Sequence, residues 1–199
     1  MKSVVTTILS LFFLTQCGCA FDSVSTSVSS AGPHNSNSQF EKKEKERQTV
    51  RWEKQGITFT LPPDWHKDES LSRDDEKRNE TFSISSLVWR GPGDQRIEFN
   101  IETGEKDFPV SEREMLEKDY ESNKEENTFK DVHYQEIGGV KGLYARLAGD
   151  EKRINASWLT YRHHNGKAQS IGVNLVGPSN EMELLMTILN SLKLEHDRN

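Results

Sequence analysis

The adjacent histidines His163 and His164 are the most suggestive pair of side chains for metal or acid–base chemistry in this sequence. They end the segment "INASWLTYRHH", whose composition is typical of a β-strand. Neighbouring side chains of a strand point to opposite faces, so regular geometry prevents the pair from binding one metal ion together. A turn follows them directly and could relax that geometry. We therefore expect a surface turn, with a metal or proton-sensing role as the alternative.

Other catalytic groupings are absent from the sequence. A nucleophilic triad needs a base beside the nucleophile and a third group that orients the base. No cysteine follows position 19, and no G-x-S-x-G motif occurs. His66 and His133 have no partner at metal-ligand spacing, and the acidic stretches lack the spacing of a calcium loop. We expect no enzymatic activity, no bound metal and no cofactor.

Glycines and tryptophans are the remaining residues of interest. Gly138 to Gly142, "GGVKG", lie between two expected strands, with no following helix that could offer its amides to a phosphate. We interpret these glycines as turn and bulge residues. The four tryptophans are expected mainly in the core or at corners, and two of them exposed together would mark a binding face; they are Trp52, Trp65, Trp89 and Trp158.

Both cysteines, Cys17 and Cys19, stand just after the apolar run "VVTTILSLFFL", which follows Lys2. This arrangement is typical of an export signal. The run has about 11 residues, whereas a membrane span needs roughly 20. In one interpretation the segment resembles a bacterial lipoprotein signal, and one of the cysteines carries the lipid. In the other, cleavage after Ala20 removes both cysteines. We favour lipidation.

Composition restricts the partners of the protein. The 199 residues include 26 Lys and Arg against 32 Asp and Glu, a formal net charge of −6. Nucleic-acid binding requires clustered cations, and no basic patch occurs, so we expect no nucleic-acid partner. The expected domain has no cysteine, so its stability cannot come from a disulfide framework.

The chain divides into four expected parts: an export signal over residues 1–19, a polar linker over 20–49, one domain over 50–194, and a tail over 195–199. The linker is rich in Ser, Asn and Gly and then in charges of both signs, a composition that cannot bury enough apolar surface to fold. A domain of this length can bury one core.

Alternating apolar residues predict an antiparallel sheet. The expected strands cover residues 57–61, 81–91, 95–104, 128–139, 140–149, 154–164 and 168–177, and residues 67–80 are expected to form a polar loop. "NGK" after His164 is a strong hairpin signal. Ser111 and Glu114 have capping-box spacing and predict a helix from Ser111 to Lys124. A second, core-facing helix is expected within 182–192. The fold class is α+β, an antiparallel β-sheet with helices packed on it.

The domain resembles the PsbP/Mog1/DcrB-like superfamily over about 145 residues, essentially its whole length. The resemblance rests on "GITFTLPPDW", "RIEFNI", "IGGVKGLYARL", "WLTYRHHNGKAQSIGVNL" and "LLMTILNSLKL". It implies an α/β sandwich and a noncatalytic role. In that superfamily the photosystem subunits bind a membrane complex, Mog1 binds a small GTPase, and the bacterial envelope members are lipoproteins. No functional residue carries over by position.

These observations favour an exported, lipid-anchored, noncatalytic binding or scaffold module of the bacterial cell envelope, whose partner is an envelope or membrane protein complex. One alternative is an envelope enzyme or metal-dependent protein that uses His163 and His164. Another is a small-ligand carrier, which requires an apolar cavity between helix and sheet. The alternative to an anchored protein is a soluble one that is secreted or located in the periplasm.

Overall fold

The computed structural model describes residues 47–79, 82–104, 107–125, 128–149 and 151–195. The expected export signal, Cys17, Cys19 and nearly all of the expected linker therefore lie outside the described residues. Eleven strands and two α-helices are described: β1 (Gln48–Trp52), β2 (Ile57–Leu61), β3 (His66–Lys67), β4 (Arg73–Asn79), β5 (Phe82–Arg90), β6 (Arg96–Gly104), α2 (Glu112–Glu125), β7 (Phe129–Ile137), β8 (Val140–Leu147), β9 (Arg153–His164), β10 (Lys167–Pro178), α3 (Met182–Asn190) and β11 (Lys193–Leu194). Short 3₁₀ turns, η2 (Glu53–Gln55) and η3 (Ser179–Glu181), precede β2 and α3.

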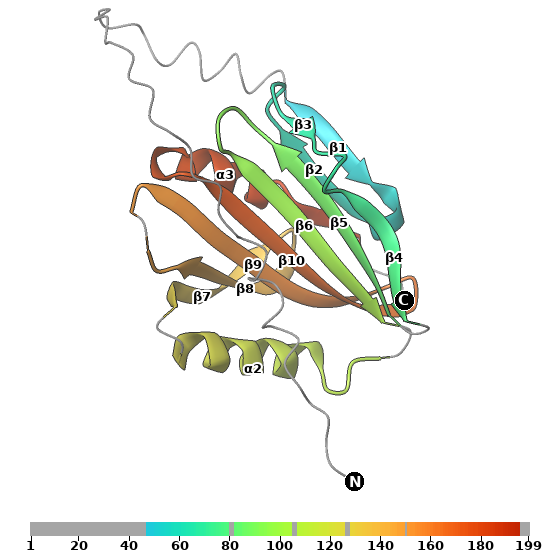
Figure 1. The fold of residues 1–199 in the computed structure, drawn as a ribbon. Helices are drawn as coiled ribbons and strands as arrows, with labels where there is room; N and C mark the ends of the chain where they lie inside the picture. The colour runs from blue at the N-terminus through green and yellow to red at the C-terminus, as the bar shows by residue number, and fades with distance from the viewer. Residues whose placement is uncertain (1–46, 80–81, 105–106, 126–127, 150, 196–199) are drawn as a thin grey trace, which may run out of the picture. The chain divides into compact units, whose positions relative to one another are not determined.

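Two antiparallel sheets organise the domain (Figure 1). The larger sheet has eight strands in the order β3-β5-β6-β10-β9-β8-β7, and β4 also pairs with β5. The smaller sheet has the order β1-β2-β11. Strands therefore dominate the α+β fold, and the described residues form only two α-helices.

The main core lies on the face of the larger sheet that carries the smaller sheet and α3. Alternating residues of β6 and β10 supply one wall, and Ile57, Phe59 and Leu61 of β2 supply the other. Helix α3 adds Leu185, Ile188 and Leu189, all nearly inaccessible to solvent. These alternating patterns are the ones that predicted the strands, because a half-buried strand buries every second side chain.

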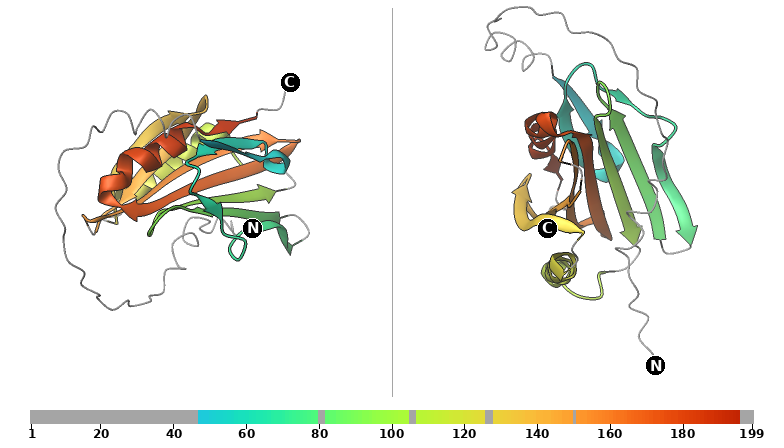
Figure 2. Two further views of the ribbon diagram at one scale, coloured as in Figure 1. Left: turned by 90° about the horizontal axis from the view of Figure 1, so that it is seen from above. Right: turned by 60° about the vertical axis from the view of Figure 1, so that its left-hand side comes forward.

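Helix α2 packs on the opposite face, against β7, β8 and β9 (Figure 2). Its Leu116 packs in a second apolar cluster with Leu143 and Tyr161. The predicted capping box is present: the Ser111 backbone N–H donates to Glu114 at 3.0 Å, and the Glu114 N–H donates to Ser111 Oγ at 3.3 Å. Below the helix, the Tyr161 hydroxyl donates to Asp119 Oδ2 at 2.6 Å.

The Asp119 contact predicts a pH effect on stability. Burial raises the pKa of Asp119, although the hydrogen bond from Tyr161 acts in the opposite direction. The folded state then binds the proton more tightly than the unfolded state, so stability falls as pH rises between the unfolded and folded pKa values. Asp119→Asn cannot ionise and keeps an acceptor for Tyr161. Urea denaturation at about pH 3 and about pH 7 should show the wild type losing stability relative to this variant as pH rises.

Asp68→Asn is the control of opposite sign. Hydrogen bonds from Ser70 and Arg90 lower the pKa of Asp68 to about 2. A depressed carboxyl pKa contributes stability that is present above the unfolded pKa and is lost as pH falls. The wild type should therefore gain stability relative to Asp68→Asn as pH rises. If the stability difference between wild type and variant changed with pH in the same way for Asp119→Asn and Asp68→Asn, the opposite pKa shifts of these two carboxyls would be contradicted.

The predicted strands and helices are largely confirmed, including the hairpin after His164, where Asn165 and Gly166 have φ of 52° and 69°. The polar loop predicted over residues 67–80 is wrong, because β4 forms there and pairs with β5. The sheet also begins earlier than the expected domain boundary, since β1 starts at Gln48. No helix in the described ranges is both long and apolar enough to cross a membrane.

The "GGVKG" glycines have two different roles. Gly138 and Gly139 have φ of 60° and 80° and form the predicted turn. Gly142 is neither a turn nor a bulge residue, because it lies inside β8, where an added Cβ would overlap the indole of Trp158. The close approach of this large ring requires a residue without a side chain.

Candidate functional site

The structure separates the two histidines. His163 lies beside α2, where its Nδ1 is 3.0 Å from Glu112 and its Nε2 is 3.1 Å from Asp107. His164 is 7% exposed, and its Nε2 is 3.0 Å from the side-chain amide of Asn165. The predicted opposite orientation of neighbouring residues is confirmed, and the pair does not share a site. Across the described ranges, no three His, Cys, Asp or Glu side chains group as a metal site requires.

The four tryptophans fall into two groups. Trp65 and Trp158 are core residues, 3% and 0% exposed. Trp52 is at the edge of the core, and Trp89 is half-buried. Both Trp52 and Trp89 line a pocket of about 240 Å³, which we call the interlayer pocket. None of the four is exposed, so the expected pair of exposed tryptophans is not found. The pocket that Trp52 and Trp89 line is nevertheless the candidate binding site.

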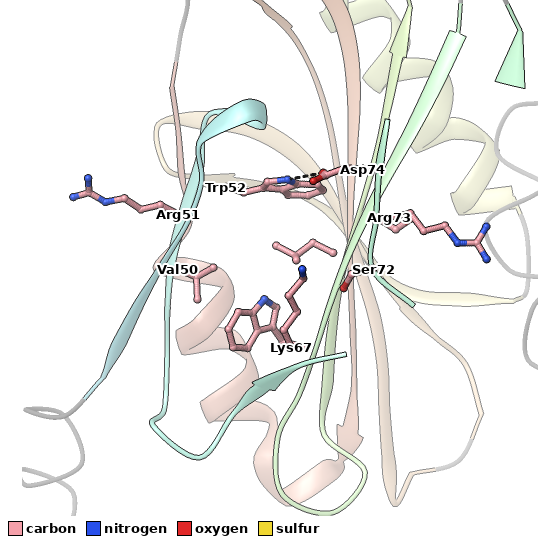
Figure 3. A pocket seen from close by; sticks show the side chains of 10 residues that line it. Val50, Arg51, Trp52, Lys67, Ser72, Arg73 and Asp74 are labelled. Carbon is pink, nitrogen blue, oxygen red and sulfur yellow. Dashed lines mark hydrogen bonds between the residues drawn. The ribbon is translucent and has the colours of Figure 1, made fainter. Parts of the chain in front are cut away.

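The interlayer pocket opens between β1 of the smaller sheet and β3, β4 and β5 of the larger sheet (Figure 3). Its surface is more apolar than polar, and each of the four strands, together with the segment between β3 and β4, contributes a polar residue. The lining residues are Val50, Arg51, Trp52, Lys67, Ser72, Arg73, Asp74, Ser86, Leu87 and Trp89. The pocket lies where the two sheets separate at their edges, because β1 pairs only with β2.

Side-chain directions distinguish the three cations of the lining (Figure 3). Lys67 extends between the two walls, whereas Arg51 and Arg73 point away from the space between them. Lys67 Nζ pairs with Glu69 at 2.8 Å, and Arg73 pairs with Glu76 at 2.9 Å. Lys67 is therefore the cation best placed to contact a bound molecule.

Two consecutive aspartates of β4 hold the two sheets together at the pocket, and we call them the aspartate bridge. Asp74 Oδ1 accepts a hydrogen bond from Trp52 Nε1 at 3.0 Å. Asp75 Oδ2 pairs with Lys54 Nζ at 2.6 Å, and this ammonium holds the pKa of Asp75 below its ordinary value against the effect of burial. The segment that follows β1 is thus fastened to β4.

The aspartate bridge is a β-bulge. In the register of β4 with β5, Arg73 pairs with Ser86 and Glu76 with Ile84, so two residues of β4 lie opposite Ser85 alone. Asp75 has φ of 43°, a conformation that residues with a side chain seldom adopt. Bulges re-aim side chains next to binding sites, and such backbone conformations concentrate there. Here the bulge directs Asp74 and Asp75 to different partners.

The segment between β3 and β4 contributes Ser72 to the pocket lining and is held by Asp68. Asp68 Oδ2 accepts from Arg90 Nε at 2.6 Å, and its Oδ1 accepts from the hydroxyl of Ser70 at 2.6 Å. Ser72 Oγ donates to the Asp68 carbonyl and accepts from the Val88 N–H. These hydrogen bonds therefore fix the segment between β3 and β4 to β5.

A buried polar network connects the aspartate bridge to β9. Gln55 Nε2 donates to Ser85 Oγ at 3.0 Å, and Gln55 Oε1 accepts from Gln169 at 3.0 Å. Arg162 Nε donates to Gln169 Oε1 at 3.1 Å, and its other nitrogens donate to the Gln55, Gly56 and Glu195 carbonyls. Arg162 is only 3% exposed, so this network fixes η2 and the end of β11 to the larger sheet.

The sequence interpretation missed Arg162, Gln55 and the pocket residue Lys67. A signal for Arg162 was present: Ile154, Trp158 and Arg162 occupy positions of the same parity in β9, and the first two face the core. A charged residue at such a position indicates a buried polar partner. The partners could not be identified because they come from distant segments.

The side chains that line the pocket are suited to noncovalent binding of a ligand. Two indoles and two aliphatic side chains can hold an apolar group, and Lys67 can pair with an anion. The hydroxyls of Ser72 and Ser86 donate to the Asp68 carbonyl and to Asn100 Oδ1. Neither serine is therefore arranged as a nucleophile beside a base.

No family model matches the sequence, and no curated protein matches it. Solved structures similar to the chain include LpqN of Mycobacterium tuberculosis, involved in cell envelope biogenesis, at 16% identity and a TM-score of 0.47, covering 82% of this chain and 99% of that one. Another is cyanobacterial PsbP (CyanoP) of Synechocystis, at 14% identity and a TM-score of 0.46, covering 75% and 93%. A Bacteroides thetaiotaomicron protein has 12% identity and a TM-score of 0.44, covering 71% and 46%. The second structure carries the family name of the resemblance stated from the sequence.

Proposed function

We propose that the protein is an exported, noncatalytic binding module of the bacterial cell envelope, anchored by a lipid on Cys17 or Cys19, and that it binds a small ligand in the interlayer pocket. The export signal and the two cysteines at its end support the location and the anchor. The single observation that carries the binding function is the open, mainly apolar space between Trp52 and Trp89.

The size of the pocket limits its ligand. A cavity of about 150 Å³ binds benzene, and drug-sized sites begin at about 300 Å³. At about 240 Å³ the interlayer pocket can hold a substituted aromatic group of one or two fused rings, or a short chain. This size favours the small-ligand carrier among the alternatives raised by the sequence, with the pocket between two sheets instead of between helix and sheet.

The open space also argues for a binding role because protein interiors are close-packed. The chain could fill the gap with one larger side chain at Val50 or Ser72, yet it places small residues there and a bulge beside them. Departures from close packing and regular geometry concentrate at functional sites. A ligand would restore the contacts that the two indoles lack.

Filling the pocket should abolish ligand retention. Val50 lines the pocket, and Thr49 on the other face of β1 is exposed, so Val50→Trp places a ring inside and Thr49→Trp places it outside. We expect the wild type and Thr49→Trp, purified from the native host without denaturation, to retain one small-molecule species in native mass spectrometry. Val50→Trp should lose at least about 90% of it, since overpacking excludes the ligand.

Equal thermal stability of the two variants would show that the loss is specific. Retention of the species by Val50→Trp, or its absence from the wild type, would contradict the proposal. The anchor is tested in the same preparation: the mass of the N-terminal peptide should include a lipid on Cys17 or Cys19. An N-terminus at Phe21 would contradict lipid anchoring and leave the pocket function in place.

A further inference from the structure

We infer that the ligand of the interlayer pocket is a small amphipathic carboxylate, with its apolar part between Trp52 and Trp89 and its carboxylate on Lys67. This inference rests on the proposed function, because it names the chemistry that the same pocket selects. Three observations support it: the unused hydrogen-bond donors of Lys67, the hydrogen bonds of the other polar groups in the lining, and the charge of the pocket compared with that of the chain.

Lys67 has unused hydrogen-bonding capacity. Its ammonium carries three N–H donors, and its one hydrogen-bond partner among the described residues is Glu69. The side chains of Lys67 and Glu69 are 38% and 77% exposed, and exposed ion pairs contribute little to stability. An anion in the pocket can therefore share or replace Glu69 at small cost. Because the side chain already extends between the walls (Figure 3), the ligand need not reorganise it.

The acceptors of the pocket, by contrast, are partly occupied. Asp74 Oδ1 accepts from Trp52, and Ser72 Oγ accepts from the Val88 N–H. The indole N–H of Trp89 has no hydrogen-bond partner among the described residues, but it is fully buried and does not reach the space. The Lys67 ammonium is thus the donor that a bound molecule can reach, and it favours a ligand that brings acceptors. A cationic ligand would find one carboxylate in the lining, with Oδ1 already engaged, and would face the Lys67 ammonium.

The charges around the pocket are also compatible with an anionic ligand. The chain has a net charge of −6, which opposes the approach of anions from a distance. The lining contains Lys67, Arg51 and Arg73 against Asp74, and Glu69 and Glu76 pair with Lys67 and Arg73. Arg51 points away from the space and forms no ion pair with a described residue. The pocket is therefore close to neutral on an acidic chain, and Lys67 supplies the positive charge that faces the space.

The test uses matched probes and the isotopically labelled full chain. 2-Naphthoate, 2-naphthamide and 2-naphthylmethylamine share one apolar body and differ in charge. Nuclear magnetic resonance titration should move the side-chain N–H signals of Trp52 and Trp89. We expect 2-naphthoate to bind about tenfold more tightly than 2-naphthamide, the effect of one charge-assisted hydrogen bond at a half-exposed site. Lys67→Met should reduce this ratio to about twofold or less, because the acid loses a charge-assisted hydrogen bond and the amide loses at most a weaker bond to its neutral carbonyl oxygen.

The outcomes separate the two levels of the proposal. Equal binding of acid and amide at the pocket, or tighter binding of the amine, would overturn the carboxylate and keep the pocket function. Absence of any signal change at Trp52 and Trp89 would overturn both. A peptide ending in a free phenylalanine carboxylate distinguishes the source: tighter binding than 2-naphthoate identifies a chain terminus, and weaker binding identifies a free acid, both in support of the carboxylate.

Discussion

Replacing Arg162 with methionine is expected to lower the free energy of unfolding by about 3–4 kcal/mol, one of the two largest effects that we predict. Methionine retains most of the apolar volume but removes every donor. Gln169 Oε1 and the Gln55 and Glu195 carbonyls then lose the guanidinium N–H groups that they accept from, whereas the Gly56 carbonyl still accepts from the Glu195 N–H at 2.9 Å. Arg162 itself is 3% exposed. A buried acceptor left without a donor costs about 1 kcal/mol or more, so three such losses give the estimate.

Arg153 provides the matched control on the same strand. It pairs with Asp94 at 3.0 Å, and the two side chains are 49% and 70% exposed. Arg153→Met should therefore change the free energy of unfolding by less than about 1 kcal/mol. Guanidinium denaturation of both variants measures the difference. A loss below about 1 kcal/mol for Arg162→Met would show that the network does not hold η2 and β11 to the larger sheet.

Replacing Gly142 with alanine is expected to cost about 2–3 kcal/mol. Two effects oppose each other here. In a strand, alanine is favoured over glycine by about 0.5–1 kcal/mol because the unfolded chain loses freedom. The added Cβ, however, overlaps the indole of Trp158, which is fully buried and whose Nε1 donates to the Gln135 carbonyl at 3.1 Å. Since the ring cannot move without losing this bond and its packing, the overlap dominates.

A double-mutant cycle with Trp158→Phe tests the cause. The smaller ring frees the space beside β8, so Gly142→Ala should be at least about 1 kcal/mol less damaging in the Trp158→Phe background. Thermal or chemical denaturation of the four proteins measures this coupling. A neutral or stabilising Gly142→Ala in the wild-type background, or additive losses, would contradict the close approach.

The sequence predicted those elements whose signals are local. The alternation of Ile97, Phe99 and Ile101 identifies β6, and the Ser111 and Glu114 pair identifies the start of α2. The Asn-Gly pair after His164 identifies the hairpin of β9 and β10. In each case the residues whose pattern predicts the element are the residues that form it, so the element can be predicted without knowing any contact to a distant segment.

Strand β4 was missed for a physical reason. Its sequence "RDDEKRN" has no apolar residue, because it lies at an edge of the larger sheet and is mostly exposed. Charged residues protect edge strands from pairing with other chains, and they remove the alternation by which a strand is identified. The polar loop predicted there followed directly from this lack of pattern.

The pocket and its supporting network depend on contacts between distant segments. Arg162 contacts Gln55 and Gly56, more than 100 residues earlier in the chain. The interlayer pocket depends on the spacing of two sheets, which no single segment encodes. The sequence did not single out Trp52 and Trp89 among the four tryptophans, and it did not identify Lys67, because the pocket forms only where β1 lies opposite β3, β4 and β5.

The most direct test of the central claim is a crystal structure of the protein purified from its native host under conditions that retain small molecules. The account predicts one ordered small molecule between Trp52 and Trp89, with a carboxylate oxygen within hydrogen-bonding distance of Lys67 Nζ. A pocket closed by its own side chains, or an ordered ligand bound elsewhere on the domain, would contradict the claim that the interlayer pocket is the binding site.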